Sequence, residues 1–90
     1  MPEQTLENQI SRGRAAESFA EDPVFTAAVE RVRRRAVEDW QATRPDDVAG
    51  REQQHALLRA LERVLSEINT VVNDGKVAQS TLARRKQRAN

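Results

Sequence analysis

The sequence has no cysteine, few aromatic residues and no long apolar run. Without cysteine the chain can form neither a disulfide framework nor a cysteine-ligated zinc finger. The longest runs of consecutive apolar residues have three members, as in 56–58. Such runs are too short for a membrane-spanning helix or for the apolar core of a signal peptide. With only three glycines and three prolines, the chain has few points at which helices must break.

Charged residues make up 32% of the 90 residues, and 15 basic side chains almost balance 14 acidic ones. The chain is rich in alanine, arginine, glutamate and leucine, which are strong helix formers. We therefore predict a small all-α protein with a helical domain over 1–82, a basic tail over 83–90 and no membrane partner. We expect it in the cytoplasm.

Two helices are predicted in the first half of the chain. The first covers about 5–20, with Thr5 as its N-cap and Gly13 in its interior. The second covers 23–43, because Asp22-Pro23 pairs a capping residue with proline at the first helical position. Apolar residues then recur every three or four positions, and the second helix should end before Pro45.

The third predicted helix, 47–73, has the strongest apolar pattern. Its large apolar residues follow alternating steps of three and four, and Leu57, Val64 and Val71 widen this stripe on one side. We expect Gly75 to end the helix in the left-handed conformation. A weak, frayed helix over 76–86 and a mobile basic end should follow.

The short connection near residue 45 predicts that the second and third helices form an antiparallel hairpin. With the first helix folded back, the expected architecture is a three-helix up-down-up bundle. The third helix is longer than the second, so either the first helix or another subunit must cover its end. We accordingly expect an oligomer or a bundle that docks on a partner. The predicted helix-packing stripe consists of Phe25, Val29, Val32, Trp40, Leu58, Leu61, Leu65, Ile68 and Val72.

Residues that could support catalysis are scarce. The single histidine, His55, lies at the edge of the apolar stripe, where a boundary side chain is the favoured interpretation over a base or ligand. The three glycines have no phosphate-loop spacing. Asn73-Asp74-Gly75 lacks the alternating acids of a calcium loop. We therefore predict no enzyme activity, no catalytic or metal site, no cofactor and no small-molecule ligand.

Two basic clusters could contact phosphates or an acidic protein surface. In the first, between Arg31 and Arg35, we expect i,i+4 pairs with Glu30, Glu38 and Asp39 to neutralise much of the charge. The second follows Asp74, after which the chain has five basic residues and no acidic one. Its candidate contacts with nucleic acid or an acidic partner are Arg84, Arg85, Lys86 and Arg88.

The stretch 11–87 resembles a group of short helical proteins encoded by tailed bacteriophages and prophages near virion and DNA-packaging genes. The residues that carry the resemblance are Arg14-Ala15-Ala16-Glu17, Asp22-Pro23-Val24-Phe25, Trp40-Gln41-Ala42-Thr43, Asp47 with Arg51-Glu52, and Gly75-Lys76 with Ala78. The resemblance implies an accessory protein of the virion or the packaging machinery, located in the host cytoplasm, in the virion or in both, and it brings no catalytic or ligand residues.

Two functional hypotheses follow. The first is a structural or assembly protein of a phage particle that acts through helix–helix contacts with itself or a larger assembly. The second is a small DNA-binding accessory factor, similar to a small terminase subunit, whose basic clusters contact phosphates without sequence specificity. A small enzyme would need a nucleophile–base pair or a metal set, and the sequence suggests neither.

Overall fold

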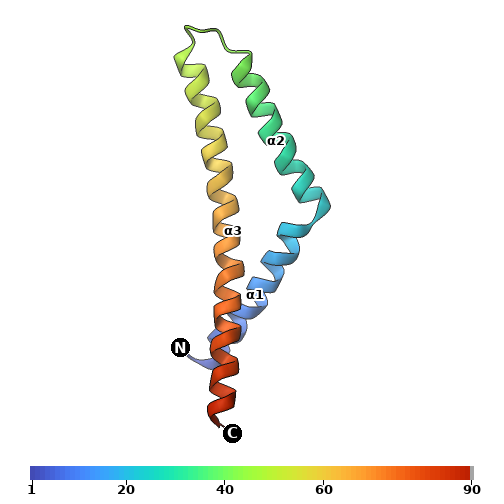
Figure 1. Cartoon of the computed structure of the whole chain (residues 1–90), viewed down its shortest axis with the longest axis vertical. Helices are drawn as coiled ribbons and strands as arrows, with labels where there is room; N and C mark the ends of the chain where they lie inside the picture. Colours follow the sequence, from blue (N-terminus) through green and yellow to red (C-terminus); the bar gives the residue numbers. More distant parts are fainter. Residues whose placement is uncertain (90) are drawn as a thin grey trace. The chain divides into compact units, whose positions relative to one another are not determined.

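In the computed structural model, which describes residues 1–89, the chain forms three α-helices and no strand (Figure 1). Helix α1 spans Glu3–Glu21, α2 spans Pro23–Gln41 and α3 spans Val48–Ala89. The all-α prediction is confirmed. The helices form two compact units: α1 with the part of α3 from Ser66 onward, and Asp22–Leu65, which contains α2 and the first part of α3.

Helix α1 begins earlier than the sequence predicts. The backbone N–H of Leu6 donates to the carbonyl oxygen of Pro2 at 3.2 Å, which places Thr5 inside the first turn. The prediction of Thr5 as N-cap is therefore wrong. Pro2 can precede this turn because proline lacks an N–H group that a helix start would leave unpaired.

The start of α2 confirms the predicted cap. Asp22 has extended backbone angles, and its carboxylate accepts hydrogen bonds from the N–H groups of Val24 at 2.9 Å and Phe25 at 3.1 Å. Pro23 occupies the first turn of the helix. These two bonds satisfy N–H groups that have no partner within the helix.

Replacing Asp22 with alanine should lower the free energy of unfolding by about 1 kcal/mol, within the roughly 0.5–2 kcal/mol typical of lost N-caps. Urea denaturation followed by circular dichroism measures this change. Asp39→Ala is the matched control, because Asp39 is an exposed residue in the last turn of the same helix, far from the cap. Equal stabilities for the two variants would contradict the capping role.

The α2–α3 turn is held by the first residues of α3. Asp47 accepts a hydrogen bond from the N–H of Gly50 at 2.9 Å, and so caps α3 as the acidic pair before it predicted. The Arg51 guanidinium donates to the carbonyl oxygens of Arg44 at 3.0 Å and Pro45 at 2.8 Å. The side chain of Arg51 therefore occupies backbone acceptors that the turn leaves outside any helix.

Helix α3 continues through the predicted stop at Asn73-Asp74-Gly75. Gly75 is helical, and no glycine among the described residues has a positive φ. The predictions of a left-handed Gly75 and of a separate helix over 76–86 are therefore wrong. The basic segment 83–89 is the end of α3, and residue 90 lies outside the described residues.

A close contact between backbones explains Gly75. In the unit formed by α1 and the second part of α3, a Cβ atom built on Gly75 would lie 2.8 Å from Cα of Gly13 and 3.0 Å from the carbonyl oxygen of Gln9. A Cβ on Gly13 would lie 3.2 Å from the carbonyl oxygen of Val71. Both positions are buried, so the two glycines let the helix backbones touch where any side chain would hold them apart.

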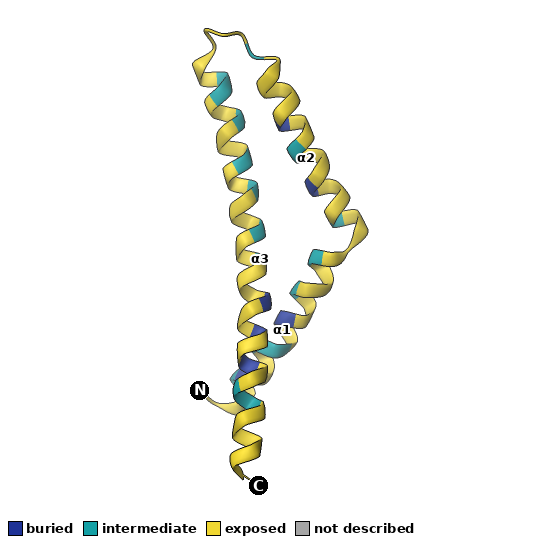
Figure 2. Cartoon of the chain, in the orientation of Figure 1, coloured by how far each residue is buried: buried dark blue, intermediate teal, exposed yellow. Residues whose placement is uncertain are grey.

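Helix α1 covers the part of α3 beyond Ser66. The sequence predicted that either the first helix or another subunit would cover this end, and the first helix does so. Buried positions gather along the facing sides of these two helices (Figure 2). Leu6 is 3% exposed and Val72 is 8% exposed. Lys76 of α3 also lies 3.6 Å from the Glu17 carboxylate of α1. The first helix therefore packs within its own chain.

Candidate functional site

The residues of the predicted helix-packing stripe are buried to different degrees. Val29 and Val72 are buried, and most of the other residues are half-buried. Val32 and Trp40, however, are 37% and 50% exposed. The half-buried members are Phe25, Leu58, Leu61, Leu65 and Ile68.

On α3 the covered positions form one regular series, which we call the inner row. It runs along the helix in steps of three and four and continues past the predicted stop to the half-buried Leu82. Gly75 belongs to this series although it has no side chain. The members of the inner row are Arg51, Gln54, Leu58, Leu61, Leu65, Ile68, Val72, Gly75, Ala78 and Leu82.

Beside the inner row lies a second apolar series, which we call the side row: Leu57, Val64 and Val71. Their exposed fractions are 46%, 54% and 38%. The next position at this seven-residue spacing, Ala78, is 2% exposed. The side row was predicted to widen the packing stripe, but at these positions the chain leaves it open to solvent.

Within the unit of α2 and the first part of α3, Trp40 lines a largely apolar cleft of about 300 Å³ with Val37, Gln54, His55 and Leu58. The Gln54 side-chain oxygen is sealed from solvent and has no hydrogen-bond partner among the described residues. An unpaired buried acceptor costs free energy, so the Gln54 oxygen destabilises this part of the unit. His55 lines the cleft and remains an exposed boundary residue.

Arg33, a member of the first basic cluster for which no partner was predicted, connects the two helices of this unit. Its guanidinium contacts the Glu62 carboxylate of α3 at 2.7 Å and that of Glu30 at 2.8 Å. Hydrogen bonds to these two carboxylates, first Glu62 and then Glu30, raise the pKa of Arg33 above its ordinary value. The pattern of i,i+4 spacings could not reveal the Glu62 contact, because that contact depends on the register of two helices.

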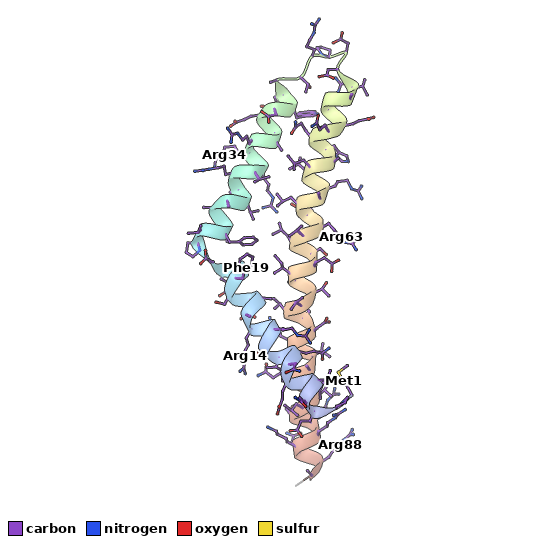
Figure 3. The ribbon with its side chains drawn as sticks, turned by 180° about the vertical axis from the view of Figure 1, so that it is seen from behind. Met1, Arg14, Phe19, Arg34, Arg63 and Arg88 are labelled. Carbon is purple, nitrogen blue, oxygen red and sulfur yellow. The ribbon has the colours of Figure 1, made fainter. Side chains whose placement is uncertain are left out.

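Arg33 binds Glu30, one of the carboxylates that were expected to neutralise the other arginines of the first basic cluster. Among the described residues, no ion pair joins Arg31, Arg34 or Arg35 to a carboxylate, so the expected i,i+4 pairs are not formed. These three arginines line a shallow surface cleft with Glu38. Arg34 projects away from α3 (Figure 3). The cluster is therefore a solvent-facing surface with a net positive charge.

The second basic cluster lies on the last turns of α3 and is exposed throughout. Arg85 donates a short hydrogen bond to the carbonyl oxygen of Met1, which ties the start of the chain to this end of α3. The side chains of Arg84, Lys86 and Arg88 have no ion pair within residues 1–89. The charges of this cluster therefore lie on regular helical backbone that is continuous with the rest of α3.

The described residues contain neither a group of side chains placed to hold a metal ion nor a helix able to cross a membrane. Within 1–89 no group of three or more His, Cys, Asp or Glu residues is placed to hold a metal ion. No helix in this part of the chain combines the length and apolar character needed to cross a membrane. Comparisons with protein-family models, curated proteins and solved structures find no match. The candidate sites are therefore the exposed side row, the Trp40 cleft and the two basic clusters.

Proposed function

We propose that this chain is a non-catalytic assembly protein that acts through helix–helix contacts, in a phage virion or its packaging apparatus. The helix–helix part of the proposal rests on the exposed side row. The phage context rests on the sequence resemblance described above. In this role the helices provide a scaffold, and the apolar surface they leave open receives a partner helix.

The side row is the observation that supports this role. A helix packed against one neighbour needs one apolar stripe, and the inner row provides it. Leu57 and Val64 add a second stripe that their own unit leaves about half exposed. Positions beside a two-helix seam normally carry charged residues, whereas apolar ones favour packing against further helices. The free energy of burying these side chains becomes available when a partner covers them.

Incorporation into particles tests this proposal. A tagged chain expressed in its native source should be found by mass spectrometry among purified particles or their assembly precursors. The double variant Leu57→Glu/Val64→Glu should be lost from both fractions, because burying two carboxylates in an apolar contact is costly. The control Val24→Glu/Val77→Glu changes two exposed valines outside the side row and should be retained. Absence of the unmodified chain, or equal incorporation of both variants, would contradict the role.

DNA contact is the second candidate function, and it is favoured because six side chains of the basic clusters have no ion pair within residues 1–89. Guanidinium and ammonium groups that are free of carboxylates can bind phosphates without first breaking an ion pair. Arg84, Lys86 and Arg88 meet this condition, as do Arg31, Arg34 and Arg35. A helix that contacts only phosphates would bind DNA without reading its sequence.

Duplex DNA binding measured by fluorescence anisotropy at several salt concentrations tests this alternative. If the four basic residues near the end of α3 contact phosphates, log Kd against log salt should have a slope of magnitude about 4. Changing Arg84, Arg85, Lys86 and Arg88 to glutamine should abolish most of that dependence. The matched variant changes Arg31, Arg34 and Arg35 to glutamine and reports on the other cluster. Affinity unaffected by either set of changes would rule out both surfaces.

A further inference from the structure

One side of α2 is exposed and faces away from the first part of α3, within the unit that these two segments form. At about 100° per residue, Ala27 and Arg31 lie nearly opposite the buried Val29. Arg34 projects away from α3 (Figure 3). Two shallow clefts follow each other along this side and share Arg31. We call this side the outer face of α2, and its members are Val24, Ala27, Ala28, Arg31, Arg34 and Arg35.

The arginines of the outer face have no carboxylate partner within residues 1–89. Arg31 has alanines three and four residues before it, and Arg34 and Arg35 three and four residues after it. Like charges at these spacings lower the stability of a helix, and a bound anionic group would offset their repulsion. Glu38 and Asp39 come only after the last of the three arginines. The middle of α2 therefore carries three unpaired positive charges that favour an anionic partner.

The first part of the outer face is apolar and equally open. Val24 is 78% exposed and lines a surface cleft with Ala27 and Ala28. Small side chains allow the axis of another helix to come close. A DNA backbone has no apolar group to cover this part, and a lipid surface is bound by larger apolar side chains such as leucine and phenylalanine. A helix that carries apolar and acidic residues on one side matches both parts of the face.

We infer that the outer face of α2 docks an acidic amphipathic helix of a partner protein, whose apolar side chains cover the first turns and whose carboxylates bind the three arginines. From Val24 to Arg35 the face is about 17 Å long at 1.5 Å per residue, so about three turns of partner helix suffice. The inference goes beyond the proposed function. Incorporation into particles is assigned to the side row of α3, and the partner at the outer face is a different protein that incorporation does not require.

Fluorescence anisotropy with a labelled synthetic helix tests the docking. The probe has leucines in its first part and glutamates in its second part, all on one side, and a shuffled peptide of the same composition is its control. Ala27→Glu places a carboxylate four residues before Arg31, where the two side chains pair within the helix. This variant should bind the probe about tenfold more weakly, because the added carboxylate occupies Arg31 and repels the probe. Its thermal midpoint should be unchanged or slightly higher. Ala56→Glu makes the same change at an exposed position of α3 outside both rows and should bind as the unmodified chain does.

Equal binding of the probe by the two Ala→Glu variants, or equal binding of the probe and the shuffled peptide, would overturn the inference. Duplex DNA serves as the second probe. Val24→Ser should weaken peptide binding and leave DNA binding unchanged, because phosphates do not need an apolar contact. If only DNA bound, and Ala27→Glu weakened it, the arginines would serve the second candidate function and this inference would fall. Ala27→Glu should enter particles normally, so its failure to bind the probe leaves the assembly role untouched.

Discussion

Replacing Gly75 with leucine is expected to lower the free energy of unfolding by about 3 kcal/mol, at the upper end of the usual cost of overpacking. Leucine is a far better helix former than glycine, so helix propensity alone predicts that this substitution raises the free energy of unfolding. The loss arises because Cα of Gly13 and the carbonyl oxygen of Gln9 occupy the space that a side chain would need. Helix α1 and α3 would have to separate, and the apolar contacts around Leu6 and Val72 would be weakened.

Asp74→Leu is the matched control for this experiment. Asp74 is the preceding residue of the same helix and is exposed, so leucine there should leave the stability unchanged or raise it slightly. Gly75→Ala should be less harmful than Gly75→Leu, because a single methyl group demands a smaller displacement. Chemical denaturation of the three variants measures the order of their stabilities. If Gly75→Leu were as stable as Asp74→Leu, the close contact between Gly13 and Gly75 would be contradicted.

Leu6→Ala is expected to cost about 2–5 kcal/mol, the range for truncating a well-buried leucine. Leu6 is 3% exposed, the lowest value among the large apolar residues of the core. Its removal takes apolar area out of the contact between α1 and α3 and leaves a cavity that two helices can only partly close. The midpoint of thermal unfolding and the free energy from urea titration should both fall.

Val77→Ala provides the comparison for Leu6→Ala. Val77 belongs to α3 in the same unit and is 64% exposed, so its truncation should change the stability by less than about 0.5 kcal/mol. A Leu6→Ala variant as stable as Val77→Ala would mean that α1 does not pack on α3 in solution. Helix α1 would then be free to bind a neighbouring molecule.

Local sequence signals predicted several helix boundaries correctly. Asp22-Pro23 and Asp47 mark the starts of α2 and α3, because capping depends on a few adjacent backbone groups. The same reasoning failed at Gly75. Asn-Asp-Gly is typical of a helix end, but the chain there is helical because a neighbouring backbone requires the absence of a side chain. No local pattern distinguishes these two uses of glycine.

For the candidate surfaces too, the sequence shows the residue pattern, whereas exposure and pairing depend on the tertiary structure. The seven-residue spacing of the side row is visible in the sequence, whereas its exposure depends on which helices cover α3. The charge pattern indicated two basic clusters, but the pairing of Arg33 with Glu62 requires the register of α2 against α3. The Arg33 guanidinium also engages Glu30, one of the two carboxylates expected to pair with Arg34.

The sequence by itself determined that the chain is helical, where two of its helices begin and which side of α3 is apolar. These properties follow from capping, proline geometry and periodicity, all of which act over a few residues. The tertiary structure decided that α3 continues to Ala89, that α1 covers its second part and that Leu57 and Val64 remain exposed. Such outcomes depend on contacts between residues far apart in the chain, which compete with local preference and at Gly75 prevail over it.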